Sequence, residues 1–189
     1  LVWNTFLGGS SYAIAVDASG NVYVAGESWA TWGSPLRPYS GGVDAFVAKL
    51  DASGALVWNT FLGGSSGQDY GWGIAVDASG NVYVGGESRA TWGSPLQAHS
   101  GSGVDAFAAK LDASGALVWN TFLGGSGSAP APDAFEGAYG IAVDASGNVY
   151  VGGACGATWG SPVQAHSGGE DAFAAMLDAS GALTWNTFL

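Results

Sequence analysis

The chain has 189 residues, a formal net charge of −11 at pH 7, 10% charged residues, 33 glycines and 9 tryptophans. With only four basic residues it has no basic footprint for nucleic acid. No run of about 20 apolar residues occurs, so we expect no membrane insertion. The single Cys155 excludes an intrachain disulfide. This composition is typical of a secreted or cell-surface β-protein.

Two sequence motifs recur along the chain and define its organisation. The heptapeptide LVWNTFL, once in the form LTWNTFL, begins at Leu1, Leu56, Leu117 and Leu183. The undecapeptide IAVDASGNVYV begins at Ile14, Ile74 and Ile141. The chain therefore consists of three near-identical units and one extra terminal strand.

The spacing of these motifs predicts the boundaries and strands of each unit. Residues 1–7 are expected to be the outer strand of a preceding unit, and the three complete units span residues 8–62, 63–123 and 124–189. Each unit is predicted to contain four short strands, because runs rich in Val, Ile, Phe, Tyr and Trp favour strands. In the first unit the predicted strands are residues 14–17, 21–26, 44–50 and 56–62.

The DASG segments predict tight turns between strands. An Asp side chain caps nearby amides and a Gly accepts a positive φ, which is the chemistry that such a turn requires. The residues of the first turn in each unit are Asp17 and Gly20, Asp77 and Gly80, and Asp144 and Gly147. A calcium site is the alternative, but each turn supplies one carboxylate, whereas Ca²⁺ takes about six or more oxygens. We expect structural turns, with no metal and no cofactor.

The predicted strands are apolar on both faces, which predicts stacked sheets. In residues 56–62, Trp58 points to one side, and Val57 and Phe61 point to the other. A sheet with one face in water alternates more cleanly between apolar and polar residues. Helical periodicity is absent. We therefore predict an all-β fold of four-stranded antiparallel sheets, stacked either as β-propeller blades or in a line.

Three motifs that recur in the same order identify a similar family. The segments IAVDASGNVYVGG, GVDAFAAKLDASG and WNTFLGG resemble the bacterial β-propeller repeat, often called the seven-bladed β-propeller repeat. This resemblance covers essentially the whole chain. It implies one blade per unit and a secreted or surface-exposed bacterial protein, and it carries over no catalytic residues. Met176 departs from the pattern, because Lys49 and Lys110 occupy the matching positions.

The side of the sheets opposite the DASG turns is the expected binding side. The connecting loops there differ between units, at Ser10–Ala13, Ser65–Gly73 and Ser126–Gly140, and variable loops on a rigid scaffold commonly carry recognition. In the ATWGSP segments, three tryptophans either stack on sugar rings or fold back to anchor a long loop. These candidates are Trp32, Trp92 and Trp159.

Further candidates on this side have simpler interpretations. The matched residues Tyr39, His99 and His166 include two histidines that could form a ligand pair, although they fall in different units and are expected to be surface residues. Cys155 stands where Ser28 and Ser88 stand in the other units, and we expect a thiol without a chemical role.

An enzymatic function finds little support in the sequence. A glycosidase needs two carboxylates at a defined separation, yet most acidic residues here repeat with the units. The exceptions are Asp69, Asp133, Glu136 and Glu170. We predict a non-enzymatic extracellular scaffold for protein interaction, adhesion or surface or filament assembly. The alternative is a carbohydrate-binding module that uses the loop tryptophans, with a glycan as its partner.

The repeat count predicts association between blades. Closed propellers generally need about four blades or more, and this chain has three units. Leu1–Leu7 duplicates Leu183–Leu189, so the two ends do not complement each other in one blade. Apolar residues of the end sheets, such as Phe46 and Phe173, would meet water. We expect the chain to be part of a larger propeller, or one segment of an oligomer or filament.

Overall fold

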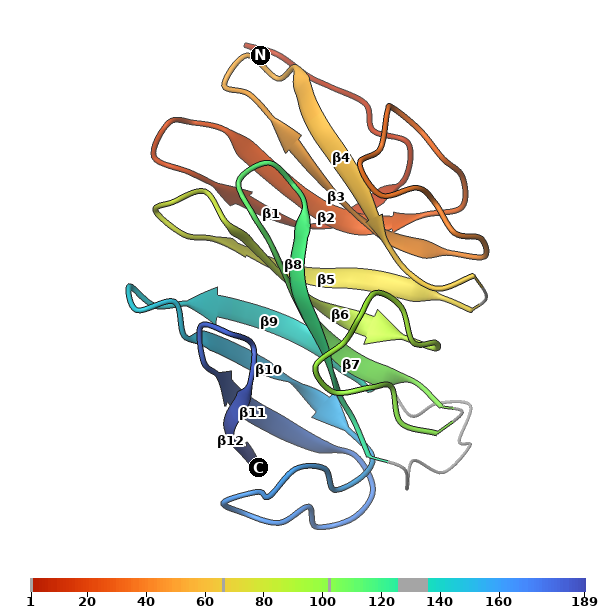
Figure 1. The fold of residues 1–189 in the computed structure, drawn as a ribbon, viewed down its shortest axis with the longest axis vertical. Coiled ribbons are helices and arrows are strands. Elements are labelled where there is room, and N and C mark those ends of the chain that lie inside the picture. The colour runs from red at the N-terminus through yellow and green to blue at the C-terminus, as the bar shows by residue number, and fades with distance from the viewer. Residues whose placement is uncertain (1, 66, 102, 126–135) are drawn as a thin grey trace.

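The computed structural model describes residues 2–65, 67–101, 103–125 and 136–189. The described residues form twelve β-strands and no helix. The strands make three four-stranded antiparallel sheets, each formed by four consecutive strands in a simple meander. Figure 1 shows the sheets following one another from the N-terminal to the C-terminal end. The predicted all-β fold with one sheet per unit is confirmed.

The strand bounds repeat from sheet to sheet. The first sheet contains β1 (Ser10–Val16), β2 (Val22–Ser28), β3 (Asp44–Leu50) and β4 (Leu56–Leu62). The second contains β5 (Asp69–Val76), β6 (Val82–Ser88), β7 (Asp105–Leu111) and β8 (Leu117–Leu123). The third contains β9 (Gly137–Val143), β10 (Val149–Cys155), β11 (Asp171–Leu177) and β12 (Leu183–Phe188).

The first strand of the first sheet begins earlier than the sequence predicts. In the first sheet, pairing with β2 continues past a β-bulge between Ser11 and Ala13 and ends at the pair Ser10 and Glu27. A bulge inserts one unpaired residue into a strand, which here is Tyr12. The predicted start of this strand at Ile14 was therefore wrong by four residues, because the pairing continues beyond the β-bulge to Ser10.

The tight turns have the geometry that Asp and Gly supply. Gly20, Gly80 and Gly147 have φ values of 80°, 80° and 83°, which side chains with a Cβ rarely adopt. In the first turn, Asp17 Oδ1 accepts hydrogen bonds from the amides of Ser19 and Asn21, both at 2.9 Å. These bonds, and above all the bond from the Asn21 side chain, hold the pKa of Asp17 below its ordinary value.

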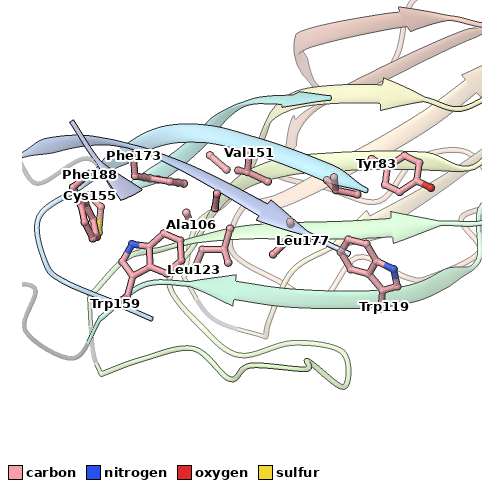
Figure 2. Packing of buried hydrophobic residues seen from close by; sticks show 14 residues of the cluster. Tyr83, Ala106, Trp119, Leu123, Val151, Cys155, Trp159, Phe173, Leu177 and Phe188 are labelled. Carbon is pink, nitrogen blue, oxygen red and sulfur yellow. The ribbon is translucent and has the colours of Figure 1, made fainter. Parts of the chain in front are cut away.

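The sheets stack with their first strands side by side. β5 packs against β1 and β2 of the first sheet, and β9 packs against β5 and β6 of the second. Two hydrophobic clusters fill the two spaces between sheets. Figure 2 shows the second of these, where Trp119 and Tyr83 of the middle sheet lie with Leu177 and Phe173 of the third. Radial packing about the first strands is the arrangement of β-propeller blades.

Candidate interaction surfaces

Each sheet has two unlike faces, which we name by their neighbours. The preceding face is the side turned toward the N-terminal neighbour, and the following face is turned toward the C-terminal one. In the middle sheet, the preceding face presents Val82, Val84, Phe107, Leu111 and Phe122. Its following face presents Tyr83, Ala106, Ala108, Trp119 and Leu123. The sheets therefore stack in one direction only, following face on preceding face.

The same joint occurs at both contacts between sheets. Trp58 of β4 donates its indole N–H to the carbonyl of Ala113 in the middle sheet, at 3.3 Å. Trp119 of β8 makes the matching bond to Ala179 in the third sheet, also at 3.3 Å. A Cβ on Gly115 would lie 2.7 Å from the Trp58 ring, so the indole packs directly on the turn backbone. We call this combination the tryptophan joint.

On the two end sheets, no further sheet completes this joint within the described residues. On the preceding face of the first sheet, Ile14 is 68% exposed, whereas the matching Ile74 and Ile141 pack into clusters between sheets. On the following face of the third sheet, Tyr150 is 38% exposed, whereas Tyr23 and Tyr83 are fully buried. The end faces thus expose residues that are covered wherever two sheets meet. The expectation that Phe46 and Phe173 meet water is wrong, because both rings are buried in hydrophobic clusters.

The open following face of the third sheet is hollowed. Ala142 of β9, Tyr150 of β10, Ala174 of β11 and Trp185 of β12 line this shallow depression, together with neighbouring backbone. Trp185 corresponds to Trp58 and Trp119 of the other sheets. This face therefore has the indole of a tryptophan joint, but no turn of a further sheet packs on it within the described residues.

Residues 2–7 occupy the corresponding place on the open preceding face of the first sheet. Trp3 donates its indole N–H to the carbonyl of Ala52 at 3.1 Å, as in the tryptophan joint. Leu7 packs against a cluster that includes Phe46 and Phe61. In Figure 1 the N terminus lies beside the turn between β3 and β4. The segment is not a strand here, because no described strand pairs with it, and the assignment of residues 1–7 as the outer strand of a preceding unit stays a prediction.

The three loop tryptophans lie beneath their own loops. Trp92 and Trp159 are buried and Trp32 is partly buried. Each ring packs edge-on against a strand-three Phe at 5.2–5.3 Å, for example Trp92 on Phe107. The backbone carbonyl of each tryptophan accepts a hydrogen bond from an Asn of strand four, such as Asn120. The rings are used in packing, so stacking on a sugar would require the loops to open.

The matched residues Tyr39, His99 and His166 also hold loops in place. Each ring packs edge-on against a strand-four Phe, at 5.3–5.7 Å. His99 Nε2 lies 3.1 Å from the carbonyl of Ser88, and His166 Nε2 lies 3.3 Å from that of Cys155. The two histidines therefore make equivalent contacts, each within its own sheet.

A repeated buried aspartate, which the sequence reasoning did not single out, closes each long loop. The backbone amides of Ser40, Ser100 and Ser167 donate at 2.6 Å to the carboxylates of Asp44, Asp105 and Asp171, respectively. Burial raises the pKa of Asp44 and Asp105, whereas the bond from the Ser167 amide lowers that of Asp171. The tripeptide DAF, which recurs at the start of the third strand of each unit, was the available signal, because an Asp at the start of an apolar strand needs a hydrogen-bond partner.

The acidic residues that do not repeat make separate contacts. Asp69 accepts bonds from Ser88 Oγ and from the Gly64 amide, and burial raises its pKa to about 7. Glu136 is buried and accepts a bond from the Gly156 amide at 3.0 Å. Glu170 is exposed, and Asp133 lies outside the described residues. Asp69 and Glu136 therefore act as hydrogen-bond acceptors that stabilise the chain near the start of two blades.

The part of the chain that the structure describes has few side chains suited to metal binding or thiol chemistry. Within it, no three His, Cys, Asp or Glu side chains come together in a way that could hold a metal ion. Cys155 is buried, its Sγ donates to the Ala157 carbonyl, and burial raises its pKa to about 12. A search of the same residues finds no helix suited to crossing a membrane.

The stacked sheets and their joints define a chain of β-propeller blades. Residues 5–31 and 57–91 match the family model described as Beta-propeller repeat. The first segment contains β1 and β2 of the first blade. The second segment contains most of β4 together with β5 and β6 of the second blade. The resemblance inferred from the sequence motifs is therefore confirmed. A comparison with curated proteins finds no match.

Proposed function

We propose that the chain is a non-enzymatic scaffold that associates blade to blade, with a second copy of the chain as its partner. The observation that carries this proposal is the pair of open end faces, which are the two halves of the tryptophan joint. Exposed apolar patches of this kind mark interaction sites on soluble proteins. The preceding face of one copy would receive the following face of another.

The internal joints supply the geometry of this contact. Trp185 of one copy would donate to the Ala52 carbonyl of the next, as Trp119 donates to Ala179. Trp3 makes that bond within the chain. Association therefore requires residues 2–7 to leave the preceding face, and this segment competes with the incoming blade. Head-to-tail contacts of this kind close into rings or extend into filaments.

An extracellular or cell-surface location is part of the proposal. The family resemblance and the low share of charged residues, 10%, support it. A role in adhesion or surface assembly would follow from a scaffold that joins copies outside the cell. The carboxyl groups of Asp69 and Glu136, which are buried near the start of two blades, accept hydrogen bonds from backbone amides. This use of the two groups favours a structural over a catalytic role.

Light scattering coupled to size-exclusion chromatography tests this proposal. The expected result is a mass above 18.8 kDa that rises with protein concentration. Ile14→Asp on the open preceding face should reduce association, whereas Val118→Asp, an exposed position in the middle blade, should not. Removal of residues 1–7 should increase association because the competing segment is gone. A monomer at all concentrations in all four proteins would contradict the proposal.

A further inference from the structure

The first strand of every blade carries a β-bulge, and the bulged residue is always aromatic. The strand registers shift between Ser11 and Ala13 in β1, between Gly71 and Gly73 in β5, and opposite Gly152 and Gly153 in β9. The residues that occupy the three bulges are Tyr12, Trp72 and Tyr139. Bulges redirect a side chain and are over-represented next to functional sites.

The three bulged rings form a row across the first strands of the blades. The centroid of Tyr12 lies 4.5 Å from that of Trp72, and Tyr139 lies 6.5 Å away on the third blade. Tyr70 of β5 stacks on Trp72 at 5.3 Å, with only 14° between the ring planes. Tyr12 and Tyr139 are 43% and 42% exposed, so both ends of the row are accessible to a ligand. We call these four residues the aromatic row.

Two carboxylates lie against the aromatic row. The Tyr12 hydroxyl donates to Glu27 Oε1 at 2.5 Å, and the Trp72 indole donates to Glu87 Oε2 at 3.1 Å. Glu27 is only 5% exposed, and its Oε2 atom is buried without a hydrogen-bond partner. A buried carboxylate oxygen without a donor is costly, which points to a donor or a cation missing from this site.

Negative charge exceeds positive charge around the row. Burial, and to a smaller extent the charge of Glu27, raises the pKa of Glu87, while the hydrogen bond from Trp72 and the charge of Arg89 lower it. Donation of the Tyr12 and Trp72 hydrogens to carboxylates also makes their rings richer in electrons. Electron-rich rings attract a cation to their faces, and the attraction grows when water is excluded.

We propose that the aromatic row, with Glu27 and Glu87, binds an organic cation, in the form of an alkylated or quaternary ammonium group. The rings of Tyr12, Trp72 and Tyr139 would contact the methyl or methylene groups of the ligand. The two carboxylates behind the rings would stabilise its charge. This site lies on the variable side of the blades, at their first strands, and is separate from the open end faces. Its occupancy does not depend on blade association.

Calorimetric titration of the full chain with choline tests the proposal, with 3,3-dimethylbutan-1-ol as the uncharged ligand of the same shape. Choline should give saturable heat, and the alcohol should bind at least about tenfold more weakly. Equal binding of the two compounds, or binding of methyl glycosides in place of choline, would overturn the proposal. Added salt should weaken choline binding because the carboxylates are partly screened.

Substitutions test whether the residues of the aromatic row and its two carboxylates bind choline. Glu27→Gln combined with Glu87→Gln keeps the shape of the site and should weaken choline binding at least about tenfold. Tyr139→Ala removes a half-exposed ring and should weaken it by a smaller factor. Tyr23→Phe is the matched control, since that hydroxyl also donates to a carboxylate, Asp17, on the turn side. Unchanged choline affinity in the double Gln variant would overturn the site.

The two sources of an ammonium group are distinguished by a second ligand. Nα-acetyl-trimethyllysine methylamide represents a peptide side chain, and choline represents a free small molecule. Tighter binding of the lysine derivative would assign the site to a modified peptide, whereas tighter binding of choline would assign it to a small quaternary amine. Absence of saturable heat with both ligands would overturn the proposal.

Discussion

The tryptophan joint makes a quantitative prediction for Trp119. Trp119 is 7% exposed, its ring centroid lies 6.4 Å from that of Tyr83, and its indole N–H donates to the Ala179 carbonyl. Trp119→Ala would remove the ring from the contact between the second and third blades. The matched change on the open face is Trp185→Ala, at the corresponding position of the third blade.

The expected cost follows from the surface that the ring buries. An aromatic side chain buries roughly 150–250 Å², which at about 25 cal/mol per Å² corresponds to about 4–6 kcal/mol. Truncations of Trp or Phe to Ala in protein cores cost about 3–5 kcal/mol. We expect Trp119→Ala to lower the free energy of unfolding by about 4 kcal/mol. Trp185 has no blade beyond it in the described chain, so its truncation should cost about half as much or less.

Urea unfolding followed by circular dichroism at dilute protein concentration measures both changes. The expected outcome is a large loss for Trp119→Ala and a clearly smaller loss for Trp185→Ala. An equal loss in the two variants would refute the reasoning, because the ring would then owe its contribution to its own blade and not to the joint.

Three further changes test other parts of the fold. Gly80→Val should cost about 1–3 kcal/mol through strain at φ 80°, whereas Gly140→Val, with no atom within 4 Å of its Cβ, should cost almost nothing in thermal unfolding. The pKa of Asp69, about 7 in the folded chain against an ordinary 3.8, means that the folded state binds more protons between these values. The contribution of this carboxyl to stability should therefore fall as pH rises from about 4 to 7, and Asp69→Asn should remove that slope in urea titrations. Trp92→Ala should release its loop and speed hydrogen exchange of the Leu96 amide, which donates to β8 at 2.9 Å, and unchanged exchange would contradict the anchoring role.

The features that the sequence predicted well depend on local chemistry. The turn at Gly80 was predictable because Asp and Gly alone supply the needed acceptor and the positive φ. β3 and β4 match their predicted bounds because both strands are rich in apolar residues and the tight turn at residues 51–54 separates them. Two-sided burial was predictable from Trp58 and Phe61, which belong to opposite faces of one strand.

The features that the sequence did not reveal depend on partners from other segments. Residues 2–7 have the sequence of β4, yet they form no strand, because a strand needs a neighbour to pair with. The burial of Asp44 depends on the path of the loop that carries Ser40. The aromatic row escaped notice because Tyr12 and Trp72 differ in type and follow connections of different length, so only the shared bulge in β1 and β5 brings them into register.

Photo-crosslinking from position 185 tests the central proposal, association through the tryptophan joint, most directly. p-Benzoylphenylalanine would replace Trp185, and crosslinked peptides would be identified by mass spectrometry. The account predicts crosslinks between two copies, from position 185 to the turn at Ala52 and Gly54, with higher yield after removal of residues 1–7. Intermolecular crosslinks that avoid this turn, or none at concentrations where the copies associate, would contradict it.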